Sequence, residues 1–332
     1  MNKNKLKSIA RKLVAPGKGI LAADESMGTI EKRFNSINVV STEKNRCFYR
    51  GLLFATPNIE QFISGVILFD ETIRQKTDNG MPFPKLLKKK GVIPGIKVDK
   101  KAKDLAGFPG EKITEGLDEL RERLIEYRDL GADFAKWRAV ITIGKGIPTR
   151  QCIDANAHAL ARYAALCQEA DLVPIVEPEV LMDGNHSLKR CEEVTGTTLI
   201  SVFSELKKYK VFLEGILLKP NMVISGKDYS HPASVKEVAK ATLRCFNKVV
   251  PKQVPGCVFL SGGLTPDEAT ERLNEINKIG RGKIPWQLSF SFGRALQQEA
   301  LQVWKGKAVN AKAAQDAFYS RAEKVSAALQ GD

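Results

Sequence analysis

Residues 134–179 read FAKWRAVITIGKGIPTRQCIDANAHALARYAALCQEADLVPIVEPE, in which two short apolar runs flank a longer stretch of helical period. The runs Phe134 to Ile141 and Val173 to Glu179 have the length and the β-branched content of buried strands. Between them, Asp154 to Ala170 repeats its apolar residues at the spacing of one helix face. A strand, a helix and a second strand in this order form a βαβ unit, the building block of parallel sheets.

Six further apolar runs follow the same alternation and bring the expected strands to eight. They are residues 19–24, 65–69, 95–98, 215–219, 258–261 and 288–291. The starts of the eight runs lie about 30 to 46 residues apart, which leaves room for a helix and its loops in every interval. Eight such units close a (β/α)8 barrel, so the sequence predicts an α/β protein with the TIM-barrel fold.

An open, doubly wound sheet is the structural alternative. That fold usually carries a G-x-G-x-x-G loop after its first strand, whereas the first run here ends in Ala22-Ala23-Asp24-Glu25-Ser26. Further helices are expected over 114–127, 234–249 and 266–279, with one before Pro16 and a C-terminal helix over 308–330. No Pro-, Ser- or Gly-rich linker divides the chain, so we expect one domain over 1–332 with the barrel at about 17–306.

The charge balance favours anionic partners. Lys and Arg total 52 against 38 for Asp and Glu, which gives a net charge of +14. The basic residues are spread along the chain, and no zinc-finger, homeodomain or RNP pattern is present, which argues against a dedicated nucleic-acid module. A solvated basic surface, a small phosphorylated substrate and secondary binding of acidic polymers all remain open at this point.

The cysteines and histidines show neither disulfide nor metal-ligand patterns. The six cysteines include no C-x-x-C pair, and His158, His186 and His231 show no H-x-x-x-H spacing. No stretch approaches the ~20 apolar residues that cross a bilayer, and residues 1–16 lack the apolar core of a signal peptide. We therefore expect a cytoplasmic protein with no membrane span, no disulfide, no metal and no cofactor.

Charged residues interrupt several expected strands near their carboxyl ends, where TIM barrels place their active sites. They are Asp24, Lys97, Lys136, Arg138, Glu177, Glu179 and Lys219. Side chains two residues apart on a strand share a face, so Lys136 and Arg138 point the same way, as do Glu177 and Glu179. Because buried charges are costly unless paired, these groups either form a purely structural ion-pair network or serve a ligand.

A lysine on an apolar strand beside a second ammonium group loses its proton more easily, and its free amine forms Schiff bases with ketones. The resulting iminium is an electron sink for cleavage of a neighbouring carbon–carbon bond, with a carboxylate such as Glu177 moving protons. Asp24 is placed to accept the proton of the β-hydroxyl group. The pattern alone does not choose among Lys97, Lys136 and Lys219 as the nucleophile.

Glycine turns follow the seventh and eighth runs, the loops in which barrels often bind phosphate. The relevant residues are Ser261, Gly262 and Gly263 in the first loop and Ser291, Gly293 and Arg294 in the second. Glycine lets backbone N–H groups approach an anion closely, and an arginine adds a charge-assisted hydrogen bond. A second anion site is predicted where Ser26, Thr29, Lys32 and Arg33 follow the first run near Lys97.

These segments resemble those of the class I, Schiff-base-forming fructose-1,6-bisphosphate aldolases. The matching blocks, in the family's order, are GILAADES at 19–26, GVILF at 65–69, GIKVDK at 95–100, GADFAKWR at 131–138, VPIVEPE at 173–179, LLKPNM at 217–222, FLSGG at 259–263 and FGRAL at 292–296. The resemblance runs from near the N-terminus to about Leu329. It implies a metal-independent enzyme that cleaves fructose 1,6-bisphosphate reversibly to dihydroxyacetone phosphate and glyceraldehyde 3-phosphate in glycolysis and gluconeogenesis, usually as a homotetramer.

The resemblance also implies a role for each candidate residue. Lys219 matches the Schiff-base lysine, Lys136 assists carbinolamine formation, and Glu177 handles its dehydration. Glu179 supports Lys219, and Asp24 deprotonates the C4 hydroxyl group. The implied phosphate ligands are Ser261, Gly262, Gly293 and Arg294 at C1, with Gly263 and Ser291 in the same loops, and Ser26, Thr29 and Lys97 at the far phosphate, with Lys32 and Arg33 nearby; Arg138 matches a substrate-binding arginine.

The end of the sequence departs from the family. Members commonly end in a tyrosine that helps exchange a proton on the bound triose phosphate, whereas this sequence ends in Gln330-Gly331-Asp332 and its last tyrosine is Tyr319. We do not transfer that role, and expect protonation by Glu177 or water. Two other hypotheses fit the physical pattern: a different lysine-dependent barrel, such as transaldolase or deoxyribose-phosphate aldolase, and a non-catalytic scaffold whose basic surface binds polyanions.

Overall fold

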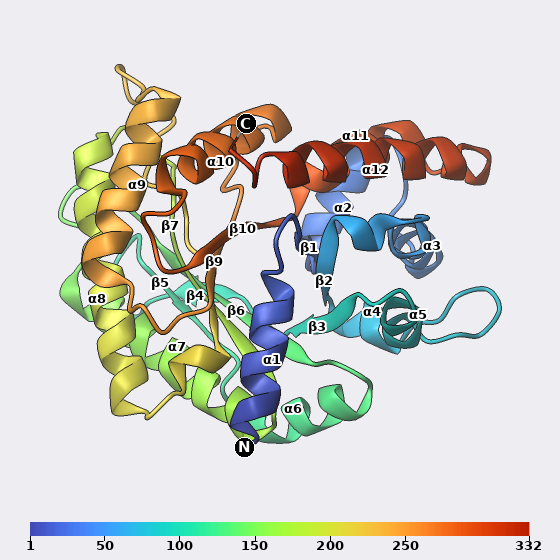
Figure 1. The fold of residues 1–332 in the computed structure, drawn as a ribbon, viewed down its shortest axis with the longest axis horizontal. Helices are drawn as coiled ribbons and strands as arrows, with labels where there is room; N and C mark the ends of the chain where they lie inside the picture. The colour runs from blue at the N-terminus through green and yellow to red at the C-terminus, as the bar shows by residue number, and fades with distance from the viewer. Residues whose placement is uncertain (332) are drawn as a thin grey trace.

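Eight apolar runs form the parallel strands of a closed barrel in the computed structural model, which describes residues 1–331 (Figure 1). The strands are β1 (Gly19–Ala23), β2 (Ile63–Leu68), β3 (Ile93–Lys97), β6 (Phe134–Ile141), β7 (Val173–Val180), β8 (Leu217–Leu218), β9 (Gly256–Phe259) and β10 (Gln287–Phe292). Each pairs with the next in this order, and β10 pairs with β1. The predicted TIM barrel is confirmed, and the strand bounds lie within two residues of the predicted runs.

Helices surround the barrel (Figure 1). They are α1 (Lys3–Leu13), α2 (Met27–Asn35), α3 (Glu43–Ala55), α4 (Asp70–Arg74), α5 (Phe83–Lys89), α6 (Leu120–Asp129), α7 (Arg150–Glu169), α8 (Leu188–Lys208), α9 (Val235–Val249), α10 (Pro266–Gly280), α11 (Arg294–Trp304) and α12 (Ala311–Ala327). Capping boxes define where two of these helices begin. Ser234 exchanges hydrogen bonds with Glu237 at the start of α9, and Thr265 does so with Glu268 at the start of α10. No helix within residues 1–331 has both the length and the hydropathy needed to cross a membrane.

An antiparallel hairpin interrupts the alternation between β3 and β6. Its strands, β4 (Ala102–Asp104) and β5 (Lys112–Thr114), pair with each other and stay outside the barrel. The helix expected over 114–127 is therefore wrong at its start, since Thr114 ends a strand and α6 begins only at Leu120. Gly116, with φ +124°, lies between them in a conformation that favours glycine and does not fit a helix.

The C-terminal helix is shorter than the expected 308–330. Residues Ala308–Asn310 form a turn of 3-10 helix, and α12 spans Ala311–Ala327. The N-terminal helix expected before Pro16 is α1.

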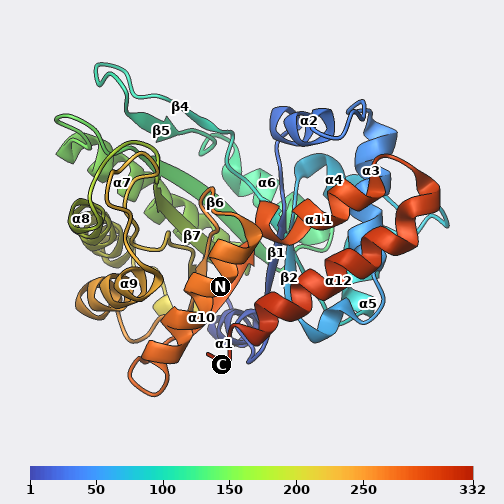
Figure 2. The same ribbon diagram turned by 90° about the horizontal axis from the view of Figure 1, so that it is seen from above.

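The side chains that face the inside of the barrel are apolar at one end and charged at the other. At the amino-terminal end of the strands the inward side chains are apolar, and Ile20, Phe134 and Leu217 pack in one buried cluster with Leu13 and other residues of α1. Figure 2 shows α1 at this end of the barrel, with α2 and the β4–β5 hairpin at the opposite end. At that opposite end the inward positions carry charge, as at Lys136 on β6.

Two glycines make the apolar end possible. A Cβ atom on Gly95 would lie 2.3 Å from the ring of Phe134, and one on Gly65 would lie 2.6 Å from Leu13 Cδ2. The missing side chains leave the volume that Phe134 and α1 fill. Helix α1 therefore closes one end of the barrel, and the charged end is left for a ligand.

Candidate active site

A cavity of about 690 Å³ opens at the carboxyl ends of the barrel strands. All of the site residues predicted from the sequence line it: Asp24, Ser26, Thr29, Lys32, Arg33, Lys97, Lys136, Arg138, Glu177, Glu179, Lys219, Ser261, Gly262, Gly263, Ser291, Gly293 and Arg294. Because parallel strands end at one rim, residues that are far apart in sequence meet there.

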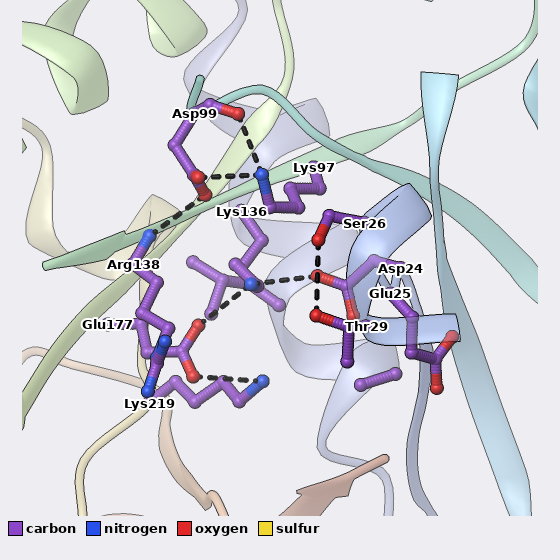
Figure 3. A network of polar contacts seen from close by, with 12 residues as sticks. Asp24, Glu25, Ser26, Thr29, Lys97, Asp99, Lys136, Arg138, Glu177 and Lys219 are labelled. Atoms are coloured by element: carbon purple, nitrogen blue, oxygen red, sulfur yellow. Dashed lines mark hydrogen bonds and ion pairs between the residues drawn. The ribbon is translucent and has the colours of Figure 1, made fainter. Parts of the chain in front are cut away.

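At the centre of the cavity, Lys136 lies between two carboxylates (Figure 3). Its Nζ is 2.7 Å from Asp24 Oδ2 and 3.1 Å from Glu177 Oε2. The second oxygen of Glu177, Oε1, is 3.2 Å from Lys219 Nζ. All four side chains are buried. The carboxylate of the fifth barrel strand thus joins the lysines of the fourth and sixth, as the alternation of side chains predicts.

The charges around Lys136 hold one another ionised. Burial raises the pKa of Asp24, but the positive charges of Lys136 and then Lys219 outweigh it, and the pKa lies well below its ordinary value. Burial lowers the pKa of Lys136, but the carboxylates of Asp24 and Glu177 outweigh it, and the pKa lies well above its ordinary value. Lys136 therefore keeps its proton at neutral pH, which suits it to stabilise negative charge rather than to attack a carbonyl.

Lys97 pairs with Asp99, a residue that the sequence analysis did not include. Lys97 Nζ lies 2.6 Å from Asp99 Oδ1 and donates to the backbone oxygen of Asp99 at 2.7 Å (Figure 3). Asp99 Oδ2 also accepts the backbone N–H of Arg138 at 3.3 Å. The guanidinium group of Arg138 in turn forms an ion pair with Glu179. The carboxylate of Glu179 therefore contacts Arg138, and its implied support of Lys219 stays a prediction.

The loops after β9 and β10 form one wall of the cavity. Gly262 and Gly263 have φ values of +52° and +93°, which glycine adopts without strain. Arg294 begins α11 and donates to the backbone oxygen of Gly263, which ties the two loops together. The hydroxyl group of Ser291 is buried and has no hydrogen-bond partner among residues 1–331, so it is available to a ligand. Free N–H groups at such turns and at the start of a helix suit an anion.

The segment after β1 forms the opposite wall. Ser26 Oγ lies 3.1 Å from Thr29 Oγ1 at the start of α2, and Lys32 and Arg33 follow on the same helix. Arg33 forms an ion pair with Glu25, a second carboxylate of the cavity that the sequence analysis missed. The third is Asp183, which lies 2.5 Å from Lys227 Nζ.

Of the three missed carboxylates, Asp99 carried a usable signal. Asp99 lies two residues beyond Lys97 and therefore shares its face, by the same rule that grouped Glu177 with Glu179. Glu25 directly follows Asp24 and falls on the opposite phase of the alternation. The pattern gave no reason to include it.

The remaining candidates for other chemistry lie outside the cavity. His158 contacts Glu205 at 3.2 Å and Tyr209 at 3.3 Å on the outer helices. Within residues 1–331, no three or more His, Cys, Asp or Glu side chains are grouped to hold a metal ion. Tyr319 packs on Phe62, with ring centroids 5.1 Å apart, and does not line the cavity.

Comparisons with known proteins show similarity to one family along the length of the chain. The family model described as fructose-bisphosphate aldolase class-I matches residues 5–332. A probable fructose-bisphosphate aldolase class 1 of Xanthomonas campestris pv. campestris is 56% identical over 332 residues, covering 100% of this chain and 99% of that protein. The cytosolic fructose-bisphosphate aldolase 4 of Arabidopsis thaliana is 53% identical over 316 residues, covering 95% and 80%.

A solved structure extends the similarity to the fold. It is fructose-bisphosphate aldolase of Plasmodium falciparum in complex with TRAP and a small-molecule inhibitor. It is 48% identical to this chain, with a TM-score of 0.97, and the match covers 99% of this chain and 95% of that one.

Proposed function

This chain belongs to the class I fructose-bisphosphate aldolase family, and we propose that Lys219 is the lysine that forms its Schiff base. The activity is the reversible cleavage of fructose 1,6-bisphosphate to dihydroxyacetone phosphate and glyceraldehyde 3-phosphate, in glycolysis and gluconeogenesis. One observation carries the assignment. Lys136 lies between two carboxylates, whereas Lys219 meets only one carboxylate oxygen among residues 1–331, at 3.2 Å.

The contacts of Glu177 support a role for it in forming the Schiff base. Its Oε1 is near enough to Lys219 Nζ to take the amine proton before attack on the C2 carbonyl. The carbinolamine that results loses its hydroxyl group as water when an acid supplies a proton, and Glu177 can return the proton it received. Lys136, which stays protonated, stabilises the negative charge on oxygen during the addition.

Cleavage of the C3–C4 bond requires a base on the C4 hydroxyl group. The carboxylate of Asp24 is held ionised beside Lys136 and is proposed to accept that proton. The electron pair of the C3–C4 bond then moves into the iminium, which leaves an enamine on Lys219 and releases glyceraldehyde 3-phosphate. Protonation of the enamine at C3 and hydrolysis release dihydroxyacetone phosphate and restore the lysine.

The two walls of the cavity are proposed to hold the two phosphates. The glycine turn of Gly262 and Gly263, the start of α11 and the unpartnered hydroxyl group of Ser291 support a site for the C1 phosphate. The side chains that support a site for the other phosphate lie at the start of α2, along α2 and at the end of β3: Ser26, Thr29, Lys32, Arg33 and Lys97. Arg138 on β6 also lines the cavity and is proposed as a substrate-binding arginine.

Borohydride trapping tests the assignment directly. The unmodified protein is incubated with dihydroxyacetone phosphate and borohydride, and the modified lysine is mapped by mass spectrometry. We expect the adduct on Lys219 and no adduct in Lys219→Met. An adduct on Lys136 or Lys97 in the unmodified protein would refute the assignment while leaving the Schiff-base reaction intact.

We also propose that the chain forms one domain and assembles as a homotetramer in the cytoplasm. Exposed apolar side chains support an assembly: Ile125 on α6 and Ile200 on α8 are 43% and 57% exposed, and Tyr209 at the end of α8 is 37% exposed. The cytosolic relative from Arabidopsis supports the location. Sedimentation equilibrium should give four times the mass of the chain, and a monomer would contradict the proposal.

Secondary binding of acidic polymers is supported by the net charge of +14. Such binding should weaken steeply with salt and persist in Lys219→Met, because it does not use the covalent chemistry. Binding lost in that variant, or insensitive to salt, would contradict it.

A further inference from the structure

Lys219 directly follows β8, the shortest strand of the barrel. Only Leu217 and Leu218 pair with β7, whereas β7 itself has eight residues. The N–H of Lys219 donates to Val176 O at 2.8 Å, and this is the last backbone contact between the two strands. The next residue, Pro220, has no N–H to continue the ladder. The backbone pairing therefore stops where the lysine and Glu177 must be held in register.

The side chain of Asn221 bridges the two strands beyond that point. Its Oδ1 accepts the N–H of Val180, the residue after Glu179, at 3.0 Å. Its Nδ2 donates to Thr195 Oγ1 on α8 at 3.2 Å and to Met222 O at 3.0 Å. The side chain is almost fully buried, and both N–H groups of its amide have acceptors. The bridge is thus rigid and shielded from water.

This bridge lies just beyond the reacting groups on both strands. Asn221 lies two residues after Lys219, and the N–H that it accepts lies three residues after Glu177. A change in the spacing of β7 and β8 here would alter the 3.2 Å separation between Lys219 Nζ and Glu177 Oε1. Misplacement of reacting groups by about 1 Å costs on the order of 100-fold in rate.

We propose that Asn221 is a positioning residue that, through its bridge to Val180 and Thr195, sets Lys219 against Glu177 for Schiff-base formation. The inference rests on the proposed role of Lys219. Asn221 does not line the cavity formed by the residues of the reaction and acts through the two strands.

The chain offers a matched control at the other end of β8. Gln168, at the end of α7, is buried to a similar degree and also makes three amide hydrogen bonds. Its Nε2 donates to Phe212 O at 2.8 Å and to Gly215 O at 3.3 Å, and its Oε1 accepts the N–H of Phe212 at 2.9 Å. These bonds hold the approach to β8 at the apolar end of the barrel, far from the reacting groups along the strand axis.

The test compares Asn221→Leu with Gln168→Met. Both changes remove a buried amide of similar size and are expected to lower the unfolding temperature. Asn221→Leu should lower kcat and the rate of borohydride trapping with dihydroxyacetone phosphate by about 10- to 100-fold, with KM changed by less than about threefold. Gln168→Met should keep kcat per trappable site within about twofold of the unmodified protein.

A second pair of variants keeps the proposal falsifiable if Asn221→Leu does not fold. Thr195→Val removes one acceptor of the bridge, whereas Thr195→Ser keeps the hydroxyl group. Slow trapping in the first and normal trapping in the second support positioning through Asn221. Equal trapping rates in all these variants would overturn it. A failure of the unmodified protein to trap substrate at Lys219 would instead refute the proposed function, before any variant is compared.

Discussion

The two ends of the barrel interior are built from the same strands, but one end is apolar and the other is charged. At the amino-terminal end, Phe134 and the α1 side chain Leu13 fill the space left by glycines with apolar contacts. At the carboxyl end, two residues further along β6, Lys136 forms ion pairs with Asp24 and Glu177. Apolar burial stabilises the folded chain, whereas buried ion pairs contribute little net stability. One end therefore holds the barrel together, and the other carries charge for chemistry.

The largest expected effect lies at the charged end. Lys219→Met removes the nucleophile, so the cleavage rate should fall by at least about 10⁴-fold. Because methionine fills a similar volume and Glu177 keeps its ion pair with Lys136, no buried charge is left unpaired, and the free energy of unfolding should change by less than about 1 kcal/mol. Steady-state cleavage and chemical denaturation measure the two quantities. A strongly destabilised variant would show that the charged end also supports the fold.

At the apolar end the expected effects are reversed. Leu13→Ala removes a buried side chain from the contact between α1 and the barrel, and should lower the free energy of unfolding by about 2–5 kcal/mol. The kcat of the folded fraction should stay unchanged. Denaturant titration, with active sites counted by borohydride trapping, separates the two. A large fall in kcat per site would mean that the two ends are mechanically coupled.

Acid should distinguish the two ends by stability alone. The folded pKa of Asp24 is lowered, so its stabilising contribution is fully present above the pKa of the unfolded carboxyl group, about 3.9, and is lost as the pH falls through the folded value. The difference in unfolding free energy between the unmodified protein and Asp24→Asn should stay constant from pH 5 to 8 and should fall by on the order of 2 kcal/mol as the pH drops below about 4. The corresponding difference for Leu13→Ala should not depend on pH. Parallel curves for both variants would place the titrating group elsewhere.

Chelation should have the smallest effect. In the cavity the carboxylates face ammonium and guanidinium groups, as Glu179 faces Arg138, and the iminium withdraws the electrons that a metal ion would otherwise withdraw. Incubation with EDTA should leave the cleavage rate unchanged. Activity that falls on chelation and returns with zinc would contradict a Schiff-base mechanism.

The strands and their facing side chains follow from the sequence because both depend on short-range periodicity. Each strand is a compact apolar run, and alternation along β6 and β7 was enough to predict that Glu177 lies between two lysines. The hairpin was missed because its strands have three residues each and β4 is largely exposed. Such short strands carry no hydrophobic pattern that differs from the start of a helix.

The alternation of side chains did not predict which charged groups the long side chains contact. In the backbone register Arg138 lies beside Glu177, yet its guanidinium group reaches Glu179, one step further along β7. The alternation of side chains and the strand register predict the face of the sheet on which a side chain lies. They do not predict which partner its charged group reaches, because the flexible stem can extend along the strand. For the same reason the sequence could not choose between Lys136 and Lys219, which differ in how many carboxylates surround them and not in the strands that carry them.

The β4–β5 hairpin makes the entrance of the cavity a part of the chain that is built separately from the barrel sheet. Lys101 and Ala102 bring it to the rim of the cavity, while Arg123 fastens its base by donating to Val98 O at 2.9 Å. Within residues 1–331 no barrel strand forms a sheet ladder with it, but Thr114 Oγ1 at the end of β5 donates to Arg138 O on β6 at 2.8 Å. A change in the length of the hairpin can therefore reshape the entrance, and it reaches the strand that carries Lys136 and Arg138 through this one side-chain contact and the packing beside it.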